Sequence, residues 1–145
     1  MFHVVEPGLR HYGGRKRFCG PICTIKVYED NLLVHEQLKE PGEGRVLVID
    51  GGGSVRSAIV GDVLAQRAKD MGYAGYVING CVRDVADCAR IDIGLMALAS
   101  TPVRPKKKGF GERGTPVAFG AGKFTPGEWL YADEDGILVC ARKLA

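Results

Sequence analysis

The sequence predicts a single mixed α/β domain of parallel βαβ units, completed by an antiparallel β segment in its C-terminal third. The length of 145 residues allows one core but not two. Between residues 46 and 99, short apolar runs alternate with segments of helical periodicity, which is the pattern of parallel βαβ units. The rest of the chain holds short β-like runs separated by Gly and Pro, as in antiparallel sheets.

Two strands and one helix are expected in the first part of the chain. Residues 22–28 alternate and are rich in β-branched side chains, which predicts a strand. Residues 32–38 follow two potential caps, Asp30 and Asn31, and precede a Pro-Gly pair, so a helix is expected there. Residues 46–49 are all apolar, which predicts a strand buried on both faces.

The middle of the chain is expected to add two helices and two strands. Apolar residues recur at helical spacing over residues 62–71, and a glycine follows as a stop, so a helix is expected. Residues 75–79 and 95–99 are short apolar runs that predict buried strands. A short helix is expected between them, at residues 85–90.

The C-terminal third is expected to be antiparallel. Short strands are predicted at residues 116–120, 128–131 and 137–140. The pair Asp135-Gly136 between the last two is a strong hairpin signal. These strands would complete the predicted domain.

Composition excludes several classes of protein. The formal charge of +3 is too small to indicate a nucleic-acid partner or a membrane surface. No apolar run reaches the roughly 18 residues that a membrane span needs, and the N-terminus lacks the features of a secretion signal. The five cysteines are odd in number and contain no CxxC pair, so we expect free thiols and a cytoplasmic protein.

The most informative segment for function is residues 61–64. It opens a predicted helix, whose free N–H groups and dipole favour an anion. We expect the backbone amides of Val63 and Leu64 to hold the carboxylate of a small acid, with Gly61 allowing its close approach. Taken alone, Asp62 would be interpreted as an ordinary helix cap.

A second candidate is the pair Arg83-Asp84, which is expected in the loop after the strand ending at Asn79. Ligands bind beyond the carboxyl ends of strands in α/β sheets. Arginine offers a fork of donors for a carboxylate or an enolate oxygen, and aspartate is a hard oxygen ligand for magnesium or manganese. Without other evidence, such a pair would be interpreted as a surface ion pair.

Together these residues form the pattern Asp62, twenty residues, then Arg83-Asp84. The pattern resembles that of the class II 4-hydroxy-4-methyl-2-oxoglutarate aldolases and their relatives, the regulators of ribonuclease E activity A. Further segments that resemble this RraA-like family are residues 12–15, 27–31, 44–54 and 131–136. The resemblance extends in order over nearly the whole chain.

The resemblance implies specific roles for these residues. Asp84 would ligate a divalent cation (Mg or Mn), Arg83 would bind pyruvate, and Asp62 would hold metal-bound water. Gly61, Val63 and Leu64, together with Asp62 and Arg83, would bind the substrate. The resemblance also implies a swivelling β/β/α fold and a homotrimer or hexamer.

Two departures from the family are expected. The extra N-terminal helical segment of the family is absent, so residues 1–145 are interpreted as one RraA-like domain. The longer aldolases also bring an acidic residue from the C-terminal helix of a neighbouring subunit, and this chain ends without such a helix. Aldol cleavage is therefore expected to be less efficient than decarboxylation.

The hypothesis is a metal-dependent lyase for 2-oxo acids that cleaves 4-hydroxy-4-methyl-2-oxoglutarate to pyruvate, decarboxylates oxaloacetate, or does both. Both reactions would pass through a metal-stabilised pyruvate enolate. The alternative is a non-catalytic regulator that binds and inhibits a ribonuclease E-type endonuclease or binds a helicase. A Schiff-base aldolase is less favoured, because Lys69 lies on the polar face of its predicted helix.

Three weaker motifs are interpreted as structural. The glycine-rich residues 50–54 resemble a nucleotide or S-adenosylmethionine loop, but Gly-x-Gly-x-x-Gly is not met, so a tight strand-to-helix turn is expected. The lysines at 106–108 and the basic residues 15–17 are expected to be solvated. The three histidines have no acidic or Cys partner at metal spacing and are expected at the surface.

Overall fold

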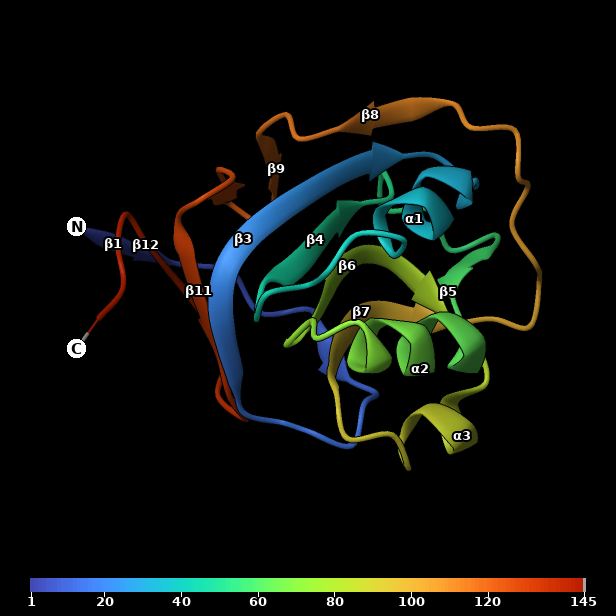
Figure 1. Ribbon diagram of the computed structural model, residues 1–145, viewed down its shortest axis with the longest axis horizontal. Helices are drawn as coiled ribbons and strands as arrows, with labels where there is room; N and C mark the ends of the chain where they lie inside the picture. The colour runs from blue at the N-terminus through green and yellow to red at the C-terminus, as the bar shows by residue number, and fades with distance from the viewer. Residues whose placement is uncertain (145) are drawn as a thin grey trace.

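A ten-stranded sheet runs through the computed structural model, which describes residues 1–144 (Figure 1). The strands are β1 (Phe2–Val4), β2 (Arg10–His11), β3 (Phe18–Val27), β4 (Val46–Asp50), β5 (Ala58–Val60), β6 (Gly75–Val82), β7 (Gly94–Ser100), β8 (Gly111–Arg113), β11 (Trp129–Ala132) and β12 (Ile137–Cys140). The main path runs β1-β12-β11-β3-β4-β6-β7-β2, while β5 pairs with β6 and β8 with β3. A separate hairpin joins β9 (Val117–Phe119) and β10 (Gly122–Phe124). The prediction of a single mixed α/β domain is confirmed.

The centre of the sheet is parallel and is connected through helices. β3 pairs with β4, β4 with β6 and β6 with β7, all in parallel register. The connections contain α1 (Leu32–Gln37), α2 (Asp62–Asp70) and α3 (Val85–Cys88). Figure 1 shows the three helices on one side of these strands and β1, β11 and β12 on the other. The central strands are therefore covered on both faces.

The side chains of β4 explain why both faces must be covered. Leu47 and Ile49 pack into the core beneath the helices, and Val46 and Val48 pack into a second core against the C-terminal strands. All four are fully buried, as the apolar run predicts. Truncating a buried Leu or Ile to Ala costs about 2–5 kcal/mol, so these positions anchor the sheet.

The C-terminal strands are antiparallel, as predicted. β11 pairs antiparallel with both β3 and β12, and β12 also pairs with β1. Five short strands are not apparent from the sequence: β1, β2, β5, β8 and β10. Each has only two or three residues, too few for periodicity to indicate a strand.

One predicted boundary is wrong in a way that affects the site. β6 does not end at Asn79 but continues to Val82, because a register shift between Ile78 and Cys81 lets the strand pair onward with β7 and with β5. Arg83 and Asp84 therefore follow the strand directly. They form the two-residue connection between β6 and α3.

All five cysteines are free thiols. Four of them are buried, and the fifth, Cys19, is exposed. No helix within residues 1–144 is long and apolar enough to cross a membrane. The expectation of free thiols is confirmed for the described chain.

Candidate active site

The two halves of the predicted triad meet where β5 and β6 end. These strands are parallel neighbours with Val60 opposite Val82, so their carboxyl ends lie at the same edge of the sheet. The backbone N–H of Arg83 donates to the carbonyl of Val60 at 3.0 Å. Beyond β5 the chain enters α2 through Gly61, and beyond β6 it enters α3. The pairing of two strands thus brings Asp62 beside Asp84.

The carboxylate of Asp84 lies over the start of α2. Its Oδ2 accepts a hydrogen bond from the backbone N–H of Asp62 at 3.2 Å and lies 3.9 Å from Nε of Arg83. The side chains of Arg83 and Asp84 are 29% and 32% exposed, so both can contact a ligand. A Cβ on Gly61 would lie 2.5 Å from Oδ2 of Asp84 and 3.1 Å from Nε of Arg83. Only glycine leaves room for both side chains here.

The backbone of Asp84 is in the left-handed region, with φ 56° and ψ 42°. Residues other than glycine rarely adopt this conformation, although Asp and Asn tolerate it best. Here it forms the N-cap of α3 while the carboxylate remains bonded to α2. Glu29, Glu43 and Ala121 also have positive φ, so this conformation positions the carboxylate of Asp84 but does not by itself assign it a role.

The two carboxyl groups are electrostatically linked. The hydrogen bond between Asp62 and Asp84 raises the pKa of Asp62, and partial burial and the charge of Asp84 add to the effect. Burial acts to raise the pKa of Asp84 as well. The hydrogen bonds from Asp62 and the positive charges of Arg83 and Arg104 outweigh this effect, so the pKa of Asp84 lies below its ordinary value. Two adjacent carboxyl groups with such opposed shifts favour a proton or a cation between them.

The donor set suits a hard divalent cation. Asp62 and Asp84 supply carboxylate oxygens, and magnesium usually takes one or two carboxylates and keeps several waters. Within residues 1–144, no cluster of three or more His, Cys, Asp or Glu side chains forms a complete ligand cage. A depression of about 250 Å³ beside Arg83 and Asp84 leaves space for waters. A cation held by few protein ligands fits this site, and a caged structural metal does not.

The backbone amides at the start of α2 are partly occupied by the protein itself. The N–H of Val63 donates to Oδ1 of Asp62 at 2.9 Å, and the N–H of Asp62 is bonded to Asp84. Leu64 is buried, and its carbonyl accepts from the Tyr76 hydroxyl at 2.7 Å. A substrate carboxylate would therefore share the amide of Val63 with Asp62.

A cavity of about 210 Å³ adjoins the triad and is rich in cationic side chains. Besides Gly61, Val63, Leu64 and Arg83, it is lined by Asn31, His35, Ile59, Arg104, Pro105 and Lys107. Sequence reasoning missed the functional potential of Asn31, His35, Arg104 and Lys107. No local pattern marks them, because they come from α1 and from the segment after β7.

Asn31 carries an unsatisfied acceptor. The residue is 5% exposed, and its Nδ2 donates to the carbonyl of Ile59 at 2.9 Å. Because a carbonyl only accepts, this bond fixes the orientation of the amide. Its Oδ1 is buried and has no hydrogen-bond partner among residues 1–144. An orphaned acceptor beside a cationic cavity suits a ligand hydroxyl or a water.

His35 contributes a ring that is neutral at physiological pH. Burial lowers its pKa, and the nearby charges of Lys107, Arg67 and Lys39 lower it further. Its Nδ1 lies 3.3 Å from Nη1 of Arg67. The expectation that this histidine is simply a surface residue is wrong, because it is partly buried and lines the cavity.

The glycine-rich loop after β4 is structural, as expected, but it leads to the short strand β5 and not directly to a helix. The N–H groups of Gly51 and Gly53 donate to the carbonyl of Asn79, and that of Gly52 donates to Oδ1 of Asp50. The N–H of Ser54 donates to the carbonyl of Gly51. With these amides satisfied, the loop offers no cradle for a cofactor phosphate.

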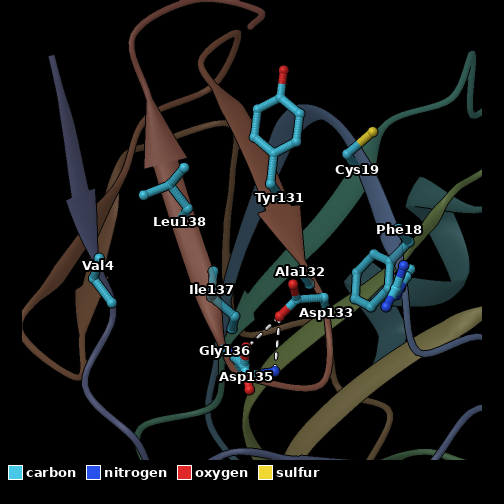
Figure 2. Close-up of a pocket in the computed structure, with 11 residues that line it drawn as sticks. Val4, Phe18, Cys19, Tyr131, Ala132, Asp133, Asp135, Gly136, Ile137 and Leu138 are labelled. Carbon is cyan, nitrogen blue, oxygen red and sulfur yellow. Dashed lines mark hydrogen bonds between the residues drawn. The ribbon is translucent and has the colours of Figure 1, made fainter.

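A larger groove of about 630 Å³ lies on the outer face of the antiparallel strands (Figure 2). Val4, Leu138, Tyr131 and Cys19 lie opposite one another across β1, β12, β11 and β3. The carboxylate of Asp133 at its end is bonded to the amides of its own turn. The groove shares no lining residue with the carboxylate site and presents no comparable set of reactive groups.

Comparisons with known proteins identify the family of the chain. The model of the RraA-like family, described as Aldolase/RraA, matches residues 3–139. A protein of Ectopseudomonas mendocina (strain ymp), named "Putative 4-hydroxy-4-methyl-2-oxoglutarate aldolase", is 52% identical over 145 residues, covering 100% of this chain and 90% of the relative.

Two solved structures are also similar, each over 99% of this chain. The RNA-processing inhibitor RraA from Thermus thermophilis has a TM-score of 0.97 and 42% identity, with 88% of its chain covered. A protein of Geobacillus kaustophilus HTA426, described as an S-adenosylmethionine:2-dimethylmenaquinone methyltransferase, has a TM-score of 0.96 and 45% identity, with 89% of its chain covered.

Proposed function

Since the chain belongs to the RraA-like family, we propose that it is a divalent-metal-dependent lyase acting on 2-oxo acids. The proposed reactions are cleavage of 4-hydroxy-4-methyl-2-oxoglutarate to pyruvate and decarboxylation of oxaloacetate. The observation that carries this proposal is the placement of Asp62, Arg83 and Asp84 around Gly61 at one edge of the sheet. It joins a pair of hard oxygen donors to a guanidinium beside a cationic cavity.

Asp84 would hold magnesium or manganese, with Asp62 orienting a water beside it. When bound, the cation would polarise the 2-oxo group and stabilise the negative charge that develops there. Arg83 acts on the same charge, because its guanidinium offers donors to the enolate oxygen and to the adjacent carboxylate. The shared amide of Val63 adds a further donor for that carboxylate.

The cavity beyond the triad suits the rest of the substrate. Both proposed substrates carry a second carboxylate, for which Arg104 and Lys107 provide positive charge. The orphaned Oδ1 of Asn31 would accept a hydrogen bond from the C4 hydroxyl of 4-hydroxy-4-methyl-2-oxoglutarate. This would orient the hydroxyl before its proton is removed.

In aldol cleavage the bond between C3 and C4 breaks, the C4 hydroxyl loses its proton, and C4 becomes the carbonyl carbon of one pyruvate. The electron pair of the broken bond forms the enolate of a second pyruvate, which is then protonated at C3. Water held by Asp62 would accept the hydroxyl proton. Oxaloacetate loses carbon dioxide from C3 and needs no such base. Decarboxylation therefore requires fewer groups than aldol cleavage.

The test is a rate measurement with purified protein after EDTA treatment, before and after adding Mn²⁺ or Mg²⁺. We expect decarboxylation of oxaloacetate and cleavage of 4-hydroxy-4-methyl-2-oxoglutarate only after metal is restored. Equal rates for EDTA-treated and metal-loaded protein, after subtraction of the metal-only background, would refute the proposal.

A second candidate function is supported by the similarity to the RNA-processing inhibitor RraA. In this alternative the chain is a non-catalytic regulator that binds a ribonuclease E-type endonuclease or a helicase through its surface. It predicts that Asp84→Asn leaves inhibition of such a nuclease unchanged. Inhibition by the protein with no turnover of any 2-oxo acid would favour this alternative over the lyase.

A further inference from the structure

The segment between β7 and β8, residues 101–110, carries two of the cations that line the cavity. We call this segment the strap. Arg104 and Lys107 on the strap are exposed. Backbone hydrogen bonds hold the strap at Thr101, Val103 and Lys106, and those of Lys106 form a bridge around Asp30. Between Lys106 and the start of β8 at Gly111, the described residues make no further backbone–backbone hydrogen bond, so this part of the strap needs another anchor.

The support comes from one buried carboxylate, that of Asp30 at the start of α1. Asp30 is 3% exposed. Its Oδ2 accepts the N–H of Lys108 at 2.7 Å, and both its oxygens accept the N–H of Gly109, at 3.1 and 3.2 Å. The N–H of Leu32 donates to Oδ1 at 3.1 Å, so the carboxylate also caps the helix. This side chain adds to the backbone bonds that join two segments 78 residues apart.

A helix cap alone does not require these features. Ser, Thr or Asn would satisfy the N–H of Leu32 with a single neutral oxygen. Burying a carboxylate is unfavourable unless hydrogen bonds compensate it, and Asp30 makes no salt bridge within residues 1–144. The second carboxylate oxygen of Asp30 accepts N–H groups of the strap. Its contacts with the strap, and not its contact with the helix, therefore explain why a charged side chain stands at this position.

We propose that Asp30 is a positioning residue for substrate recognition, because its carboxylate fixes the strap so that Arg104 and Lys107 face the cavity. This inference rests on the proposed lyase function and concerns binding of the second carboxylate. Asp30 does not line the cavity and acts only through the strap.

The main test is Asp30→Asn assayed with Mn²⁺ and 4-hydroxy-4-methyl-2-oxoglutarate, whose second carboxylate is not lost in the reaction. The amide has one acceptor oxygen, and its NH₂ group cannot accept from the strap. We expect KM to rise roughly tenfold, the order that loss of a charged hydrogen bond produces, while kcat changes less than about twofold. The matched control is Asp135→Asn, an exposed carboxamide substitution on the β11–β12 turn, which should change neither constant.

A second variant perturbs the contact between the strap and the start of α1 from the strap side. Gly109 has φ +87°, and a Cβ there would lie 3.0 Å from Cδ2 of Leu32, so Gly109→Ala should also raise KM with kcat retained. A double-mutant cycle then separates positioning from general stability. In an Arg104→Ala/Lys107→Ala background, Asp30→Asn should change KM by less than about twofold, because the groups it positions are gone. Full additivity would overturn the proposal.

Amide hydrogen exchange distinguishes failure of this inference from failure of the proposed function. The N–H groups of Lys108 and Gly109 should exchange at least about tenfold faster in Asp30→Asn than in the unsubstituted protein. If no 2-oxo acid is turned over, the lyase function fails and exchange alone decides whether Asp30 anchors the strap. Unchanged protection of both amides would overturn the inference whatever the activity.

Discussion

The backbone N–H of Asp62 donates a 3.2 Å hydrogen bond to Oδ2 of Asp84, joining two segments that are 22 residues apart in the chain. This contact seats a negative charge at the N-terminus of α2, where the helix dipole favours it. It also holds the two carboxyl groups side by side, so that either a proton or a cation relieves their repulsion. The functional predictions follow from this arrangement.

Asp84→Asn should abolish binding of Mn²⁺ and metal-dependent turnover while the fold is retained. Asparagine tolerates the left-handed backbone of this position and keeps the shape of the side chain, but it loses the charge. Calorimetric titration with Mn²⁺ and circular dichroism measure the two effects. The control is Asp70→Asn, at the exposed end of α2, which should bind Mn²⁺ normally. Normal Mn²⁺ affinity in Asp84→Asn would disprove its role as ligand.

Arg83→Ala should lower kcat by about 10²–10³-fold, the loss typical of one donor that stabilises a developing oxyanion. Arg83→Lys should recover part of this, since lysine keeps the charge but lacks the planar fork. Steady-state rates with oxaloacetate provide the measurement. If KM rose and kcat stayed constant in Arg83→Ala, Arg83 would bind the ground state and the transition state equally.

Gly61→Ala should inactivate the protein with little change in thermal stability. The new Cβ would meet Oδ2 of Asp84 at 2.5 Å and displace both Asp84 and Arg83, which are partly exposed and able to move. Gly127→Ala is the opposite case. A Cβ at Gly127 would meet no neighbouring atom, but the φ of +89° disfavours residues other than glycine. Gly127→Ala should therefore destabilise the fold by about 1 kcal/mol without affecting turnover. Paired melting curves and rates would show whether the two effects separate in this way.

Those parts of the fold that depend on local periodicity could be predicted from the sequence. The exposed residues of α2 and the fully buried run of β4 lie where their patterns predict. The pattern did not reveal that β6 continues past Asn79, because this extension depends on pairing with β5, a strand of three residues without a periodic signal. Tertiary pairing, rather than local propensity, determines that boundary.

The candidate site divides in the same way. A helix start and an adjacent Arg-Asp pair have local meaning, so Asp62, Arg83 and Asp84 could be selected from the sequence. Asn31 and Lys107 reach the same cavity because the backbone bond between Asn31 and Lys106, together with the carboxylate of Asp30, brings their segments together. Contacts between distant parts of the chain produce no characteristic sequence spacing, so these cavity residues could not be predicted from the sequence.

Thiol chemistry gives a prediction independent of the site. Burial raises the pKa of Cys23 and of Cys88 to about 11, so both are protonated at pH 8, and the thiolate is the reactive form. Ellman's reagent at pH 8 should therefore label one thiol in the native protein, Cys19, and all five after denaturation. Cys19→Ser should leave none in the native protein. Rapid reaction of a second native thiol would contradict the burial described here.

The same shifts predict how stability depends on pH. The folded-state pKa of Cys23 and Cys88 lies above the ordinary value of 9.0, so the unfolded chain releases these protons first as pH rises. The stabilising contribution is therefore complete below pH 9.0 and is lost as pH approaches 11. Melting temperatures measured across this window should fall less steeply in Cys88→Ala than in the unsubstituted protein. An equal slope would assign the alkaline loss to other groups.

Arg104→Ala should impair recognition of substrates with two carboxylates and spare ligands with one. Arg104 lines the cavity beyond Arg83, where the second carboxylate of 4-hydroxy-4-methyl-2-oxoglutarate would lie, and losing one charged hydrogen bond raises KM by roughly tenfold. The inhibition constant of pyruvate should be unchanged, because its single carboxylate is held at the triad. Lys108→Ala is the matched control: it removes a charge from the same strap, its side chain does not line the cavity, and its N–H to Asp30 is retained. The assay is run at about 0.15 M ionic strength, where long-range attraction between exposed charges is screened. An equal effect of both substitutions would show that the overall charge of the strap, and not the position of Arg104, controls binding.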